Sequence, residues 1–177
     1  MKNTFVVCLF GGPGIGKSTV AASIFSKLKW MHIETEIAFE YAKDLVFEES
    51  FGKLDNQFYI FGKQIHRLKR VMGKVDVIVT DSPLPLSIIY DYRKNAYFKK
   101  LVLDEYNAFN NINFMLKRHD SYQTTGRIQS HEEAKIVDDR IINLLEEQKI
   151  EYDYVWGSQD NIDSIIEIIL NKIGYEK

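Results

Sequence analysis

The residue types best suited to chemistry in this sequence gather in one glycine-rich stretch near its start. Gly11–Ser18 reads GGPGIGKS and fits the pattern G-x-x-x-x-G-K-[ST] with no mismatch. Glycines let the backbone bring successive N–H groups close to phosphate oxygens, and the Lys17 ammonium could reach the β- and γ-phosphates of a nucleotide. The Ser18 hydroxyl is suited to ligate Mg²⁺. The pattern predicts that ATP and Mg²⁺ bind here, with the nucleotide held by Gly12, Pro13, Gly14, Ile15, Gly16, Lys17, Ser18 and Thr19.

The segments on either side supply the context that a phosphate-binding loop requires. Phe5–Phe10 is an unbroken apolar run, as expected of a strand buried on both faces of a sheet. Ser18–Lys29 reads as a helix, whose amino terminus would add the positive end of its dipole. The alternative is a glycine-rich turn with a chance lysine, but strand, loop and helix in this order favour nucleotide binding.

Asp81 is the candidate acid of the metal site. It follows Val75–Thr80, which reads as a second buried strand, and P-loop proteins place their Mg²⁺-linked acid at such a position. The alternative is an ordinary turn, since Asp81-Ser82-Pro83 has turn-forming composition. We expect Ser18 and Asp81 to serve the metal, although Asp81 could contact the acceptor instead.

Three glutamates, Glu34, Glu36 and Glu40, are candidates for a general base. A kinase whose acceptor is a hydroxyl benefits from a carboxylate that orients the hydroxyl and accepts its proton. Each of the three could instead be a solvated charge at a helix start. The residue types alone leave the choice among them open.

Arg118 and Arg127 flank a polar stretch, with Gly126 beside the second arginine. A planar guanidinium matches the charge that phosphoryl transfer spreads over the transferred oxygens. We therefore expect a lid at about residues 118–131 that closes over ATP and excludes water. The alternative is two ordinary surface arginines.

Other charged and metal-binding residue types carry weaker signals. The basic residues of the segment 63–74 could contact a polynucleotide acceptor, but such a run is more often the solvated face of an amphipathic helix. The histidines lack metal-ligand spacing and the chain has a single cysteine, so no zinc site is predicted. The basic set consists of Lys63, Arg67, Lys69, Arg70 and Lys74.

Length and composition limit the number of domains and the classes of partner and location that the chain can have. With 177 residues, 45% hydrophobic content and a net charge of −2, the chain suits one soluble domain and has no overall drive toward nucleic acid. Cys8 lies inside the first apolar run and is expected to be a core residue in a reducing compartment. No apolar run reaches the length of a membrane span and the start lacks a signal-peptide pattern, so a cytoplasmic location is expected, the host cytoplasm if the protein is phage-encoded.

Strand and helix signals alternate along the sequence. Further strands are predicted at Trp30–Glu34, Asn113–Leu116 and Tyr152–Trp156. Strands separated by helices predict an α/β fold with a mostly parallel five-stranded sheet, and ligands of such sheets bind at the carboxyl ends of the strands. Helices are predicted over the ranges 35–50, 55–72, 84–92, 97–109, 131–148 and 160–173.

Short motifs beyond the phosphate loop resemble the NadR-type ribosylnicotinamide kinase domain. Glu40–Leu45 reads EYAKDL and is similar to the E-Y-A-[RK]-x-[LY] segment of that family. Thr80-Asp81-Ser82 resembles its D-[ST], and Val155-Trp156-Gly157 resembles its V-x-G near the end. Asp55-Asn56-Gln57 with Lys63-Gln64 is similar to its glutamine-bearing helix. The likeness spans nearly the whole chain and is closest to small phage-encoded P-loop proteins labelled AAA-family ATPases.

The resemblance implies a nucleoside- or nucleotide-kinase-like P-loop core with strand order near 2-3-1-4-5 and a lid. It also implies that the segment with Glu40 faces the acceptor, which makes Glu40 the preferred base. The chain departs from NadR in lacking an adenylyltransferase domain and in carrying Lys43 and Ser82 where arginine and threonine are common. The sequence shows no sensor or arginine-finger region of the kind that a ring-forming motor needs.

These signals predict a Mg²⁺-ATP-dependent kinase that moves the γ-phosphoryl group to a hydroxyl of a nucleoside, a nucleotide or a related small molecule. Lys17, Glu40, Asp81, Arg118 and Arg127 are the expected catalytic residues. Nicotinamide riboside is the acceptor that the resemblance suggests first. One alternative is a phage-type kinase acting on a modified base or an end of DNA. An alternative of another class is a regulatory nucleotide-switch ATPase without a phosphate acceptor.

Overall fold

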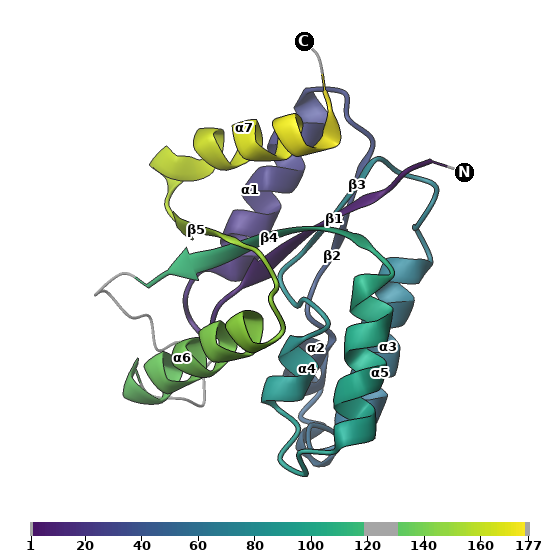
Figure 1. Cartoon of the computed structure of the whole chain (residues 1–177), viewed down its shortest axis with the longest axis vertical. Helices are drawn as coiled ribbons and strands as arrows, with labels where there is room; N and C mark the ends of the chain where they lie inside the picture. Colours follow the sequence, from purple (N-terminus) through teal and green to yellow (C-terminus); the bar gives the residue numbers. More distant parts are fainter. Residues whose placement is uncertain (1, 119–130, 176–177) are drawn as a thin grey trace.

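The computed structural model describes residues 2–118 and 131–175, in which parallel strands alternate with helices (Figure 1). The five strands form one sheet with the order β2-β3-β1-β4-β5, and every pairing is parallel. This confirms the predicted α/β fold and its strand order. The strands are β1 (Phe5–Phe10), β2 (Thr35–Ala38), β3 (Val77–Thr80), β4 (Asn110–Lys117) and β5 (Asp153–Trp156).

Helices cover both faces of the sheet, as parallel strands require. One face packs against α1 and α7, and the other packs against α3, α4, α5 and α6 (Figure 1). The helices are α1 (Lys17–Trp30), α2 (Tyr41–Phe47), α3 (Gln57–Lys69), α4 (Leu86–Ile89), α5 (Ala96–Asn107), α6 (His131–Glu147) and α7 (Ile162–Ile173), with short 3₁₀ helices η1 (Phe51–Lys53) and η2 (Gln159–Asn161).

The central strand β1 explains why its sequence is an unbroken apolar run. Val6, Cys8 and Phe10 point into the core on the α3–α6 face, whereas Val7 and Leu9 point into the core under α1 and α7. All five side chains are buried. A strand with helices on both sides has no solvated face, so alternation between apolar and polar residues is lost.

The predicted position of β2 is wrong, and the difference matters for the site. Trp30 closes α1 with its side chain 78% exposed, and His32 then takes a left-handed turn with φ of 61°. The strand follows at Thr35–Ala38, where it pairs in register with Val77–Thr80 of β3. Pairing with a buried neighbour outweighs the helical spacing in this segment. As a result Phe39 and Glu40 directly follow the strand.

Smaller differences concern the helix ends. The helix predicted over 55–72 begins at Gln57 and is capped by Asn56, whose side chain accepts a hydrogen bond of 3.2 Å from the Tyr59 N–H. The helix predicted at 84–92 is limited to one short turn, α4, and β4 begins earlier than predicted, at Asn110. In the segments 2–118 and 131–175, every helix is too short or too polar to cross a lipid bilayer.

Candidate active site

The phosphate loop joins the buried end of β1 to the start of α1. Gly16 precedes the first helical turn with φ of 97°, a left-handed conformation that side chains with a Cβ rarely adopt. Ile15 is buried in the core under α1 and α7, which fixes the loop to the body of the protein. The first turn of α1 carries no acidic residue, so nothing on that turn neutralises the positive end of its dipole. The loop thus presents backbone donors and positive potential together.

Lys17 folds back over the loop that precedes it. Its Nζ donates hydrogen bonds to the carbonyl oxygens of Gly11 at 2.7 Å and Gly12 at 3.0 Å. Burial lowers the pKa of Lys17, while the carboxylates of Glu40 and Asp81 oppose that decrease. The ammonium therefore lies among acidic groups that come from other strands.

Asp81 and Glu40 meet at the carboxyl ends of the adjacent strands β3 and β2. The Asp81 side chain is only 2% exposed, and its Oδ1 accepts a hydrogen bond of 2.8 Å from the Glu40 backbone N–H. Burial is the largest cause that raises the pKa of Glu40; the Asp81 charge adds to it and Lys17 opposes it. A carboxyl with a raised pKa next to a phosphate loop is suited to accept a proton.

Buried and half-buried polar contacts fix the turn between β2 and α2 that carries Glu40. The Thr80 hydroxyl donates to the Ala38 carbonyl at 2.8 Å, and the Gln64 side chain accepts from the Tyr41 N–H at 3.0 Å. Arg67 donates to the Phe39 carbonyl at 2.8 Å and forms an ion pair with Asp44. The backbone on both sides of Glu40 is thus hydrogen-bonded to α3 and β3, which fixes where its carboxylate can lie.

A groove of about 1300 Å³ opens beside the phosphate loop. Ser18, from the first turn of α1, and Glu40 both line it. Gly157 and Ser158, which follow β5, line it as well. The groove brings the predicted metal-ligating hydroxyl and the predicted base to one solvent-accessible space.

Arg118, directly after β4, contacts the phosphate loop through its side chain. Its guanidinium donates to the Pro13 carbonyl at 3.0 Å and, through Nε, to Asp138 Oδ2 at 2.6 Å. The other oxygen of Asp138 accepts a hydrogen bond of 2.5 Å from the Gly12 N–H. Arg118 thus lies at the phosphate loop. Arg127 and most of the predicted lid lie outside the described residues.

Asp138 on α6 is a site residue that the sequence analysis does not single out. A signal for it exists, because Asp138 interrupts the apolar stripe of Ala134, Val137 and Ile141, which are all buried. The apolar residue Ile136 on the same helix, in contrast, is 59% exposed. A carboxylate on the buried stripe of a helix needs a charged or donor partner, and here it has both.

The sequence that forms this site matches a known protein family. A family model described as an AAA domain matches residues 6–161. The chain belongs to this AAA-domain family. The matched range contains the phosphate loop, Glu40, Asp81, Arg118 and Asp138. No curated protein sequence matches the chain.

Solved structures share the fold of this AAA-domain protein at low identity. Deoxyadenosine kinase from M. mycoides, with the products dCMP and dCDP bound, has a TM-score of 0.57 at 20% identity, covering 97% of this chain and 100% of that one. APS kinase CysC from Mycobacterium tuberculosis, in complex with AMPPNP and APS, has a TM-score of 0.54 at 11% identity, covering 98% and 99%. At these identities the likeness concerns the fold, which is that of P-loop nucleotide kinases.

The remaining glutamate candidates lie differently from Glu40. Glu34 precedes β2 and pairs with Lys2 at 2.5 Å, and Lys2 also contacts Asp76 at the start of β3. This places Glu34 at the amino ends of the strands, the opposite edge of the sheet from the phosphate loop. Glu36 lies within β2, two positions before its end.

Several members of the basic set bond within the protein. Arg67 is engaged by Phe39 and Asp44, Lys69 pairs with Glu105 at 2.6 Å, and Lys63 lies 5.5 Å from the centre of the Tyr59 ring. A continuous row of free cations would be needed to follow a phosphate backbone. These contacts instead fit the solvated face of α3.

The donor set of this AAA-domain protein fits a nucleoside triphosphate. A Cβ on Gly12 would lie 2.8 Å from the Ala134 carbonyl and 2.8 Å from Asp138, so the loop can follow this path only with glycine. Across residues 2–118 and 131–175, no three His, Cys, Asp or Glu side chains gather as a metal site. Mg²⁺ in phosphate sites commonly takes one or two protein ligands together with phosphate oxygens, which Ser18 and Asp81 would satisfy.

Proposed function

We propose that this AAA-domain protein is a Mg²⁺-ATP-dependent phosphotransferase that moves the γ-phosphoryl group to a hydroxyl of a nucleoside, a nucleotide or a related small molecule. The observation that carries the proposal is the Glu40 carboxyl, with a raised pKa, beside the phosphate loop and held there through the bond from its N–H to Asp81. A nucleotide-binding switch needs no such base. The fold shared with deoxyadenosine kinase and APS kinase supports the same reaction class.

The phosphate loop binds the donor. The backbone N–H groups of Gly14–Thr19 and the dipole of α1 attract the phosphate oxygens. Lys17 leaves its two carbonyl partners in the loop and donates to the β- and γ-phosphates. Ser18, and Asp81 directly or through water, would hold Mg²⁺, which would supply positive charge against the phosphates. Asp81 also holds Glu40 in place by accepting a hydrogen bond from the Glu40 backbone N–H.

Glu40 is the general base of the proposed reaction. Its carboxylate accepts the proton of the acceptor hydroxyl as that oxygen attacks the γ-phosphorus and ADP leaves. Partial burial makes the carboxylate a stronger base than an exposed glutamate. Arg118, whose guanidinium donates to the Pro13 carbonyl of the loop, stabilises the charge on the transferred oxygens, and Arg127 is proposed as a second cation on sequence grounds.

We also propose that residues 1–177 act as a single kinase-like domain whose lid spans about residues 118–131. Among acceptors, deoxynucleosides are suggested by the similarity to deoxyadenosine kinase, and nicotinamide riboside by the NadR-like motifs. An acceptor of this kind presents a primary hydroxyl on a sugar, which suits one carboxylate base.

A transfer screen with γ-labelled ATP and Mg²⁺ tests the proposal. Deoxynucleosides, nucleoside monophosphates, nicotinamide riboside and DNA with hydroxymethylated bases serve as acceptors, with Lys17→Ala as the inactive control. We expect a labelled small-molecule product that requires Lys17. Label found only on DNA would favour the DNA kinase. Label found only as free phosphate with every acceptor would favour the regulatory ATPase and overturn the proposal.

A further inference from the structure

The carboxylate of Asp138 connects helix α6 to the phosphate loop. One oxygen accepts from the Gly12 N–H at 2.5 Å, and the other accepts from Arg118 Nε at 2.6 Å. The two side chains of the ion pair are 13% and 10% exposed, so the pair is largely removed from water. The second residue of the loop, the end of β4 and the middle of α6 therefore meet at one carboxylate.

The contact leaves little freedom to the groups that it joins. Arg118 is held twice, by Asp138 and by the Pro13 carbonyl at 3.0 Å. Gly12 lies so close to α6 that an added Cβ would collide with the Ala134 carbonyl and with Asp138 itself. A neutral side chain at 138 would remove the ion pair between Asp138 and a guanidinium that is largely shielded from water, which is costly.

Asp138 is an unusual residue to find at a phosphate site, because its charge repels phosphate. Paired with Arg118, however, its charge is compensated while its two oxygens still fix two donors. The carboxylate is shared between the loop and the arginine. Asp138 thus fixes the positions of groups that would bind phosphate.

We propose that Asp138 is a positioning residue of the phosphate-transfer site. It holds the loop backbone through the Gly12 N–H and orients the Arg118 guanidinium through Nε, so that both are already in place when the triphosphate binds. This inference rests on the proposed function, because it assigns Asp138 a role in binding the ATP donor. Its effect on the reaction passes through Gly12 and Arg118 and involves no contact with the substrate.

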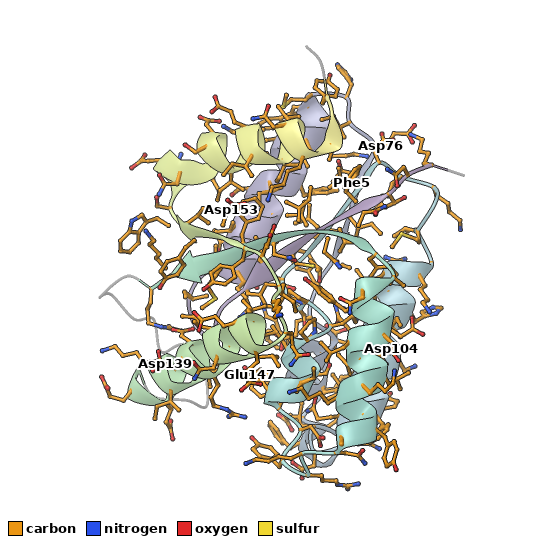
Figure 2. The ribbon with its side chains drawn as sticks, viewed as in Figure 1. Phe5, Asp76, Asp104, Asp139, Glu147 and Asp153 are labelled. Carbon is orange, nitrogen blue, oxygen red and sulfur yellow. The ribbon has the colours of Figure 1, made fainter. Side chains whose placement is uncertain are left out.

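The test compares Asp138→Asn with Asp139→Asn, a matched control on the exposed side of the same helix (Figure 2). Hydrogen exchange measured by mass spectrometry reports on peptides that contain Gly12, and calorimetry gives the Kd for ATP with Mg²⁺. We expect faster exchange in the loop and a Kd raised roughly tenfold for Asp138→Asn, because the amide keeps one acceptor oxygen for two donors and carries no charge to pair with Arg118. Asp139→Asn is expected to match the unsubstituted protein in both measurements.

A double substitution separates positioning from general support of the fold. If Asp138 acts through Arg118, the losses of ATP affinity in Asp138→Asn and Arg118→Gln are not multiplied in the doubly substituted protein. If Asp138→Asn unfolds the protein, Asp138→Glu serves instead: it keeps the charge, misplaces it by one methylene, and is expected to weaken ATP binding while the protein stays folded.

Three outcomes would overturn the inference. The first is ATP affinity in a folded Asp138 variant within about twofold of the control, whatever the melting temperature, since about twofold is well below the effect of a lost buried partner. The second is unchanged exchange in the loop, and the third is multiplied losses in the double variant. If the unsubstituted protein binds no nucleotide, the proposed function itself fails. In the three outcomes above, the unsubstituted protein binds ATP and only the role of Asp138 fails.

Discussion

Glu40 and Lys17 have opposite charges, and partial burial shifts the pKa of each toward its neutral form. Burial raises the pKa of Glu40 and lowers the pKa of Lys17, while the attraction between the two groups opposes both shifts. For Glu40 the net direction is upward. The carboxyl thus gains basicity, and Lys17 remains available as a hydrogen-bond donor to phosphate.

Replacing Glu40 with glutamine is expected to reduce kcat/KM for the acceptor by roughly a hundredfold or more, because a general base contributes about 10²–10⁴. The Kd for ATP should change little, since Glu40 is proposed to act on the acceptor. Steady-state kinetics with Glu34→Gln as the control measure the effect, because Glu34 pairs with Lys2 at the other edge of the sheet. Equal activity of the Glu40→Gln and Glu34→Gln proteins would contradict the role.

Glu40 should also determine how kcat/KM depends on pH. The base works only when it is deprotonated, so kcat/KM should fall as the pH decreases through the pKa of Glu40. Because burial raises that pKa, the fall should begin at a higher pH than for an ordinary glutamate. Glu40→Gln should remove this acid limb from the residual activity; an unchanged limb in the variant would assign it to another group.

Gly12 and Gly62 differ in the space that a side chain at each position would find. Gly12→Ala is expected to destabilise the protein by about 1–3 kcal/mol, because its Cβ would overlap a backbone oxygen of α6. Gly62→Ala is expected to stabilise it by about 0.5–1 kcal/mol, because Gly62 lies inside α3 with open space around it. Thermal or denaturant unfolding measures both, and a Gly12→Ala protein that is as stable as the unsubstituted one would contradict the close approach at Gly12.

At the scale of elements, α3 holds the turn that carries Glu40. Its side chains reach the backbone at Phe39 through Arg67 and at Tyr41 through Gln64, on either side of the base. Short loops between parallel strands and helices place functional groups at the carboxyl edge of a sheet. Here the placement depends on a helix that itself contributes no proposed catalytic residue.

Arg67→Gln is therefore expected to lower the free energy of unfolding by about 1 kcal/mol through the lost bond to the Phe39 carbonyl, and to lower kcat as well. Arg70→Gln, three residues further on, removes an exposed side chain and is the matched control. Both are read out by denaturant unfolding and by the transfer assay. If Arg70→Gln lowered both quantities as much as Arg67→Gln, the effect would come from charge on α3 rather than from the contact.

Much of the element order can be predicted because the decisive strands are buried on both faces. β1 is apolar throughout and β3 is apolar up to Thr80, and the residues that follow them, the glycine loop and Asp81, lie at the carboxyl edge as predicted. The prediction for β2 is wrong because Thr35–Ala38 has mixed polarity and becomes a strand through pairing with β3. Asp138 escapes prediction because its partners, Gly12 and Arg118, are distant in sequence and nothing local predicts their contact.

At the scale of the whole molecule, the sheet separates the core under α1 and α7 from the core on the α3–α6 face, as far as residues 2–118 and 131–175 describe them. Cys8 lies in β1 on the α3–α6 side, is buried, and burial raises the pKa of its thiol. A thiol in this position can be reached only when the sheet opens. It offers an internal probe for the stability of the fold as a whole.

Labelling of Cys8 by an aromatic disulfide reagent at pH 8 is expected to be slow and to follow unfolding of the sheet. ATP with Mg²⁺ at about 100 times its Kd should slow the labelling about a hundredfold, equivalent to about 2.7 kcal/mol of added stability. Lys17→Ala, assayed at the same ATP concentration, should lose this protection. Fast labelling of the folded protein would contradict the burial of Cys8, and protection that persists in Lys17→Ala would contradict nucleotide binding at the loop.

The most direct measurement of the central claim is the stoichiometry of the reaction. In ³¹P NMR of the protein with ATP, Mg²⁺ and the best acceptor from the screen, ADP and the phosphorylated acceptor should rise together in equal amounts, with little inorganic phosphate. Both signals should vanish in Lys17→Ala, and the acceptor signal should fall sharply in Glu40→Gln. ADP that accumulates only with inorganic phosphate, whichever acceptor is present, would contradict phosphoryl transfer and leave an ATPase.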